Sequence, residues 1–169
     1  KDFDALKGSA IIAVVLFHIG LLKSGYLGVD TVFVINGLLV IPSVIKKIEN
    51  GEFAFIRFME KRVIRLLPLI VLASAVSLGL GYWLMLPNDY ENLSQGVIAG
   101  NLMSENILSA VTTNDYWDTS NDYKPLMHLW YVGILFEFYI VMPLLMMGAN
   151  KVAKLLKKKA LKLPIFQLI

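Results

Sequence analysis

Four long apolar runs leave this sequence few ways to fold. They cover residues 5–22, 26–45, 66–86 and 125–148. Each is about as long as an α-helix must be to cross the hydrocarbon core of a bilayer, roughly 20 residues at ~1.5 Å per residue. Hydrophobic residues occupy 57% of the 169 positions, and the mean hydropathy is +0.64. Since soluble domains of this size rarely have so little polar surface, we predict an all-α fold: a polytopic transmembrane helix bundle with about four spans here.

Basic residues are distributed unevenly between the loops, and this predicts the orientation. Twelve follow the second and fourth runs: Lys46, Lys47, Arg57, Lys61, Arg62, Arg65, Lys151, Lys154, Lys157, Lys158, Lys159 and Lys162. The opposite side has only Lys23 and Lys124. By the positive-inside rule, both ends of this segment are cytoplasmic. The first run lacks an Ala-x-Ala-like cleavage site, so we interpret it as a retained helix and not as a signal peptide.

Other segments are predicted to lie at the membrane surfaces. Residues 53–68 alternate basic and apolar side chains with helical period, which favours a helix along the inner surface before the third span. On the outer side, residues 93–108 are expected to form a short helix, and residues 112–124 are polar and rich in turn formers. The lysine-rich residues 151–162 are expected to form a helix or loop near anionic lipid. We expect residues 1–169 to be the N-terminal part of a single larger transmembrane domain.

Composition also excludes several chemistries. The sequence has no cysteine, so disulfides, cysteine-based zinc sites and thiol nucleophiles are excluded, and we expect no metal. The net charge of +3 does not indicate a nucleic-acid partner, because the basic residues flank apolar runs. The partner that the charge pattern predicts is the lipid bilayer.

Ionisable residues within the apolar runs indicate a functional site, because a charge at membrane depth is costly. Counted from the outer ends of their runs, His18, Asp30 and His128 lie within roughly 5–6 Å of the same depth. A neutral imidazole such as that of His18 can act as a general base toward a hydroxyl, and a carboxylate such as Asp30 would fix its tautomer. The alternative is a histidine that only hydrogen-bonds a neighbouring helix. Glu137 is nine residues after His128, on the opposite helix face, which favours a structural polar contact.

Three cations accompany these groups. Lys7 precedes His18 by eleven residues, so both lie on nearly the same helix face. Lys7 either lines an interior channel with His18 or extends to the cytoplasmic headgroups. Arg62 and Arg65 are three residues apart, which places both guanidinium groups on one face where they could hold a phosphorylated ligand. The alternative for this pair is ordinary anchoring at the inner membrane surface.

Four segments, in this order, resemble the acyltransferase family 3 proteins. They are FHIG (17–20), GYLGVDTVFVINGLLV (25–40), KRVIRLLP (61–68) and KPLMHLWYVGILFEFYIVMP (124–143). Members are polytopic bacterial inner-membrane enzymes that O-acylate cell-surface glycans. A typical member has about ten spans, so the resemblance implies that this chain supplies a little under half of the bundle.

The resemblance also implies site residues. The essential histidine of the family corresponds to His18 and its Arg-x-x-Arg pair to Arg62 and Arg65. The Gly-Val-Asp motif ends at Asp30, and the Pro-Leu-x-His-x-Trp motif contains His128. The usual donor of the family is acetyl-CoA, bound from the cytoplasm with its phosphates on the arginine pair.

The sequence departs from the family pattern in three respects. Lys7 stands where arginine is usual, which keeps the charge but loses the planar fork. Leu135 and Phe136 stand where most members have two glutamates, with Glu137 directly after them. Asn36 replaces a serine in the second motif.

Together these patterns predict a membrane O-acyltransferase that moves an acetyl group from acetyl-CoA to a hydroxyl of an envelope or secreted polysaccharide. The predicted catalytic residues are His18, Asp30 and His128, and the predicted donor-binding residues are Arg62, Arg65 and Lys7. A proton-coupled transporter or flippase of a polar solute is one alternative, because buried His and Asp also form proton relays. A non-catalytic membrane scaffold of the same fold is another.

Overall fold

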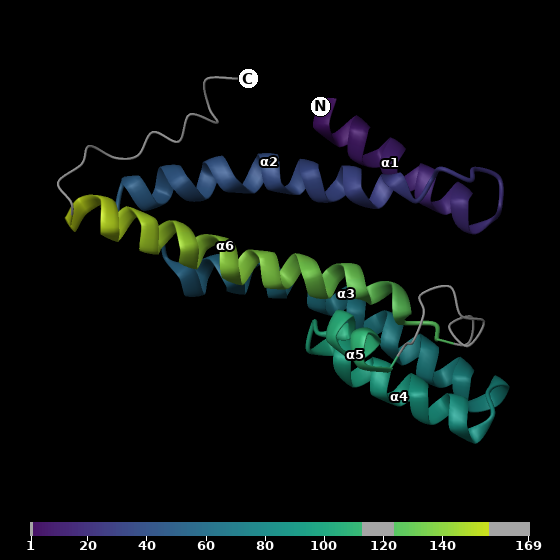
Figure 1. The fold of residues 1–169 in the computed structure, drawn as a ribbon. Coiled ribbons are helices and arrows are strands. Elements are labelled where there is room, and N and C mark those ends of the chain that lie inside the picture. The colour runs from purple at the N-terminus through teal and green to yellow at the C-terminus, as the bar shows by residue number, and fades with distance from the viewer. Residues whose placement is uncertain (1, 113–123, 156–169) are drawn as a thin grey trace. The chain divides into compact units, whose positions relative to one another are not determined.

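The protein is seen in a computed structural model that describes residues 2–112 and 124–155 (Figure 1). Throughout those ranges the regular structure is helical, without strands, which confirms the predicted all-α class. The elements are α1 (Asp2–His18), α2 (Leu27–Glu49), α3 (Phe55–Leu84), α4 (Pro87–Asn101), α5 (Glu105–Thr112), the 3-10 helix η2 (Met127–Leu129) and α6 (Trp130–Leu155). They form two compact units, one containing α1, α2 and α6 from Leu145 onward, the other covering Ala54–Leu144.

Three helical stretches are long and apolar enough to cross a membrane. They are Leu27–Glu49, Phe55–Leu84 and Met127–Ala153, and they correspond to the second, third and fourth apolar runs. The first run forms α1, whose 17 residues are at the short end of what spans a hydrocarbon core. The crossing of the first run stays a prediction.

The α1 and α2 helices pack against each other through glycine. Gly25 and Gly28 are both buried. A Cβ atom on Gly28 would lie 2.8 Å from Val14 Cγ2 and even nearer the Ala10 carbonyl oxygen, and a Cβ on Gly25 would lie 2.8 Å from Phe17 Cβ. The hydrogen side chains of these glycines therefore allow the two backbones to approach closely.

The α3 helix differs from the expectation of a separate surface helix followed by a span. It is one continuous helix of 30 residues with Pro68 in its interior, about 45 Å long at ~1.5 Å per residue. The basic first half runs into the apolar second half without a turn-forming residue, and Pro68 removes only one backbone donor, a loss that membrane helices tolerate.

The segment expected to form one helix over residues 93–108 is divided into α4 and α5. The α4 helix ends in a Schellman motif: the Ser104 amide donates to the Ala99 carbonyl at 2.8 Å and the Met103 amide to the Gly100 carbonyl at 3.0 Å. Met103 has the left-handed conformation, with φ 54°. Residues 113–123 of the polar outer segment and 156–162 of the lysine-rich segment lie outside the described residues, while α6 extends through Leu155.

Candidate active site

The Arg62 guanidinium lies against two aromatic rings. Its Cζ atom is 3.3 Å from the centroid of the Phe58 ring and 4.5 Å from that of Tyr139. The two rings are nearly perpendicular, at 88°. Phe58 is one helical turn before Arg62 on α3, whereas Tyr139 comes from α6. The cation thus contacts two π-systems, and each contact is worth about 0.5–2 kcal/mol.

Hydrogen bonding fixes this guanidinium further and leaves one donor unpaired. Arg62 Nη1 donates to the Phe58 carbonyl at 2.8 Å, and Tyr139 is close enough to interact with the Arg62 charge. The Nε atom is buried and has no hydrogen-bond partner among the residues described. A buried, unpaired N–H is costly and calls for an acceptor. Arg65 is exposed one turn later, close enough to Tyr139 to interact with it electrostatically.

The other predicted site residues of the N-terminal half belong to α1 and α2. Lys7 and His18 lie on one uninterrupted helix, about 16 Å apart along its axis. Lys7 is half-buried within its unit, and His18 is exposed at the last residue of the helix. Asp30 is exposed in the first turn of α2. Since α1 and α2 are joined by a short connection, His18 and Asp30 lie at the same end of this helix pair.

His128 lies in η2, the short 3-10 turn that precedes α6, and it is exposed. Its neighbours Leu126 and Met127 are buried, at 6% and 8% exposure. These apolar side chains anchor the turn, so the backbone that carries His128 is held against the rest of its unit. The structure places His128 in the 3-10 turn that begins the candidate span Met127–Ala153.

Glu137 makes a structural contact, as predicted. Its Oε1 atom accepts a hydrogen bond of 2.8 Å from Asn106 Nδ2, which joins α6 to α5. Gly133 lies one turn before Glu137, and a Cβ on it would overlap the Asn106 side chain. The glycine therefore leaves the space that Asn106 needs to reach the carboxylate.

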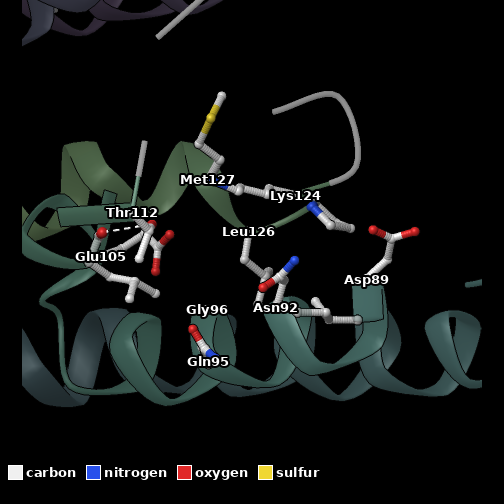
Figure 2. A pocket seen from close by; sticks show the side chains of 12 residues that line it. Asp89, Asn92, Gln95, Gly96, Glu105, Thr112, Lys124, Leu126 and Met127 are labelled. Atoms are coloured by element: carbon white, nitrogen blue, oxygen red, sulfur yellow. Dashed lines mark hydrogen bonds between the residues drawn. The ribbon is translucent and has the colours of Figure 1, made fainter. Parts of the chain in front are cut away.

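A polar cavity that the sequence did not indicate lies between α4, α5 and the segment before η2. It has a volume of about 330 Å³ and polar lining residues Asp89, Asn92, Gln95, Glu105, Thr112 and Lys124. Figure 2 shows Glu105 and Thr112 at one end and Asp89 with Lys124 at the other. Glu105 is only 4% exposed, which is unusual for a carboxyl group.

Burial raises the pKa of Glu105 to about 7, against the opposing effects of a Ser109 hydrogen bond and the Lys124 charge. The Ser109 hydroxyl donates to Glu105 Oε1 over a long 3.4 Å. The Oε2 atom is buried without a hydrogen-bond partner in the described parts of the chain. In the sequence, Glu105 is one of several acidic residues of a polar outer segment, and nothing distinguishes it from the others. Its burial depends on residues from both α4 and the segment before η2.

Helices long enough to span a membrane, together with an arginine held against two aromatic rings near the start of one of them, define a multi-pass membrane protein with a candidate anion-binding site. Residues 1–165 match the family model described as "Acyltransferase domain". The chain belongs to the acyltransferase 3 family.

The curated relatives carry matching names. The chain is similar to "Putative membrane-bound transacylase BcsY" of Komagataeibacter xylinus, with 32% identity over 83% of this chain and 36% of that protein. It is also similar to a "Putative O-acetyltransferase" of Staphylococcus aureus strain COL, with 28% identity over 85% of this chain and 24% of that protein. The chain thus spans about a quarter to a third of the length of these relatives. No solved structure matches it.

Proposed function

We propose that this chain is the N-terminal part of an O-acyltransferase that moves an acetyl group from acetyl-CoA to a hydroxyl of an envelope or secreted polysaccharide. The protein would lie in the bacterial inner membrane, with both ends of this segment in the cytoplasm. Family membership supports the acyl transfer. The donor, the acceptor, the orientation and the residue roles are the proposal.

The observation that carries the choice of donor is the stacked Arg62. A guanidinium held against Phe58 and Tyr139, whose buried Nε donor has no acceptor among the described residues, is preorganised for an anion. Little side-chain entropy remains to be lost when a phosphate binds. Exposed Arg65 adds a second charge from the same helix. The phosphates of CoA are suitable ligands for such a pair, and Lys7 is the third cation assigned to them.

His18 is the proposed general base. Its imidazole would take the proton from the acceptor hydroxyl as the oxygen attacks the thioester carbonyl. The carbon–sulfur bond then breaks, and the CoA thiolate receives the proton back from the imidazolium. The products are an O-acetyl ester and free CoA. Asp30 and His128 are the proposed supporting polar groups, one of which would stabilise the imidazolium.

The test uses the full-length protein in inverted membrane vesicles from a strain that makes the glycan. Labelled acetyl-CoA is supplied outside the vesicles, and label in ester-linked glycan is measured. Wild type is compared with His18→Ala and Arg62→Lys at matched membrane levels. Arg57→Lys is the matched control, because Arg57 is an exposed arginine on the same helix.

We expect His18→Ala to abolish incorporation. Arg62→Lys should raise the KM for acetyl-CoA about tenfold or more, the cost of losing a bidentate, stacked contact, whereas Arg57→Lys leaves it unchanged. Equal incorporation by wild type and His18→Ala would remove His18 from catalysis. No incorporation by wild type would overturn the acetyl-CoA donor and favour transport of a polar solute.

A further inference from the structure

The cavity at Glu105 is built by segments distant in sequence and is large enough for a small ligand. Its volume of about 330 Å³ is at the lower end of the usual range for ligand pockets, roughly 300–1,000 Å³. One sugar ring fits such a volume. Leu93, Leu126 and Met127 are buried around it and line its apolar part.

Glu105 supplies a built binding group within this cavity. Its side chain is more than nine-tenths buried, and Oε2 lacks a hydrogen-bond partner among the described residues. Its Oε1 has only the long contact to Ser109. A buried carboxyl that accepts so few hydrogen bonds is unfavourable unless a ligand or water supplies donors. The fold thus holds the carboxyl group in place, but the described residues supply it with too few hydrogen-bond donors.

The mixed lining selects the chemistry of the ligand. An anion would meet the carboxyl groups of Glu105 and Asp89, and a cation would meet the ammonium of Lys124. A neutral, hydroxyl-rich ligand is compatible with all three, because each hydroxyl both donates and accepts. The amides of Asn92 and Gln95 add further donors and acceptors.

We propose that this cavity binds one sugar ring of the acceptor, with a ring hydroxyl donating to the Glu105 carboxyl group. This assignment rests on the proposed function for its biological meaning, but the binding itself does not require acyl transfer. Asn92 and Gln95 orient the other hydroxyls, and Leu126 contacts the apolar face of the ring. Glu105 is thus a positioning residue for the acceptor.

Binding is measured on the full-length protein in phosphatidylcholine nanodiscs by saturation-transfer difference NMR. The probes are the methyl glycosides of glucose, galactose and N-acetylglucosamine. Glu105→Leu removes the hydrogen-bond acceptor while relieving the burial of a carboxyl. Gly96→Ala adds a methyl group that would lie 3.9 Å from both Glu105 Oε2 and Leu126 Cβ, an ordinary contact that the fold accommodates. The matched controls are Glu91→Gln, an exposed carboxylate on α4, and Gly79→Ala, whose Cβ would meet nothing within 4 Å.

We expect wild type to bind at least one glycoside, Glu105→Leu to weaken that binding about ten- to hundredfold, and Gly96→Ala to weaken it several-fold. Both controls should bind like wild type. Absence of binding by wild type, or unchanged binding by both cavity variants, would overturn the proposal. Loss of the glycoside signal on adding phosphatidylglycerol would also overturn it, because the cavity would then hold a lipid headgroup.

Acetyl transfer from labelled acetyl-CoA is followed separately with the same proteins. If the glycosides bind as expected but wild type transfers no label, the proposed function fails and the sugar site remains. If wild type transfers label but both cavity variants bind glycoside normally, the proposed function stands and the sugar site is elsewhere.

Discussion

Raising the pH should destabilise this protein through the Glu105 carboxyl group, and Glu105→Gln should remove that effect. The pKa of this carboxyl is about 7 in the folded protein against an ordinary value of 4.5. The folded state therefore binds the proton more tightly than the unfolded state. The stability that the protonated carboxyl contributes is fully present below pH 4.5 and is lost as the pH rises through 7.

The size of the effect follows from the interval between the two pKa values. At ~1.36 kcal/mol per pH unit, this interval corresponds to roughly 3 kcal/mol in the free energy of unfolding. Water in the cavity and the charge of Lys124 both screen the carboxylate, so we expect about 1–3 kcal/mol. Glutamine keeps the shape of the side chain but does not ionise. The difference in stability between the Glu105→Gln variant and wild type should thus favour the variant by about 1–3 kcal/mol more at pH ~8.5 than at pH ~5.

The assay is denaturant unfolding of the full-length protein in detergent, for wild type, Glu105→Gln and the exposed control Glu91→Gln. Labelling with dicyclohexylcarbodiimide, which attacks protonated carboxyl groups, gives a direct second readout by mass spectrometry. Near pH 7 about half of Glu105 should be protonated, compared with about one in 300 for a carboxyl of ordinary pKa. The reasoning is refuted if Glu105→Gln and wild type show the same pH dependence and Glu105 is labelled no faster than Glu91.

Three further substitutions test the packing around the candidate site. Gly28→Ala should lower stability by about 2 kcal/mol or more, because the added Cβ would overlap α1. Thermal unfolding measures this against the control Gly8→Ala, where nothing lies within 4 Å, and equal stabilities of the two variants would contradict the close approach. Asn106→Ala should cost about 1 kcal/mol by removing the bond to Glu137, and a double-mutant cycle with Glu137→Ala should show coupling; additive costs would mean that the bond contributes nothing. Arg62→Lys should lower the free energy of unfolding by about 1–2 kcal/mol in the absence of the acyl donor, because contacts with the two aromatic rings are lost. An unfolding midpoint equal to that of wild type would show that the rings do not hold the cation.

The helices could be predicted from the sequence because apolar runs of membrane length have few alternatives to α-helix. What could not be predicted is where helices join or break. The expected boundary before the third span is absent, since nothing between residues 53 and 84 interrupts the helical pattern. The break between α4 and α5 is at Met103, which occupies the left-handed position where glycine is usual. No glycine or asparagine marked that position, so the sequence favoured one helix.

The arginine pair of the candidate site also shows which features the sequence could predict and which it could not. Its spacing on α3 was evident from sequence, but the stack that fixes Arg62 requires Tyr139, which is distant in the chain. Glu105 was not identified because a carboxyl group becomes unusual only when it is buried, and its burial depends on how α4, α5 and η2 pack. For His18, Asp30 and Lys7, the structure shows a continuous α1 helix and its close packing against α2. Their catalytic and binding roles stay predictions.

Glu137 does not replace the glutamates that the family resemblance expects at positions 135 and 136. Successive residues of a helix are turned by ~100°, so side chains at 135 and 137 point about 200° apart around α6. Leu135 is buried at 8% exposure, in surroundings where a carboxylate would need its own partner. Glu137 instead bonds Asn106 on α5, and Gly133 leaves the space for that contact. In this chain, therefore, the side chain at position 135 packs among apolar residues, and the side chain at position 137 joins α6 to α5.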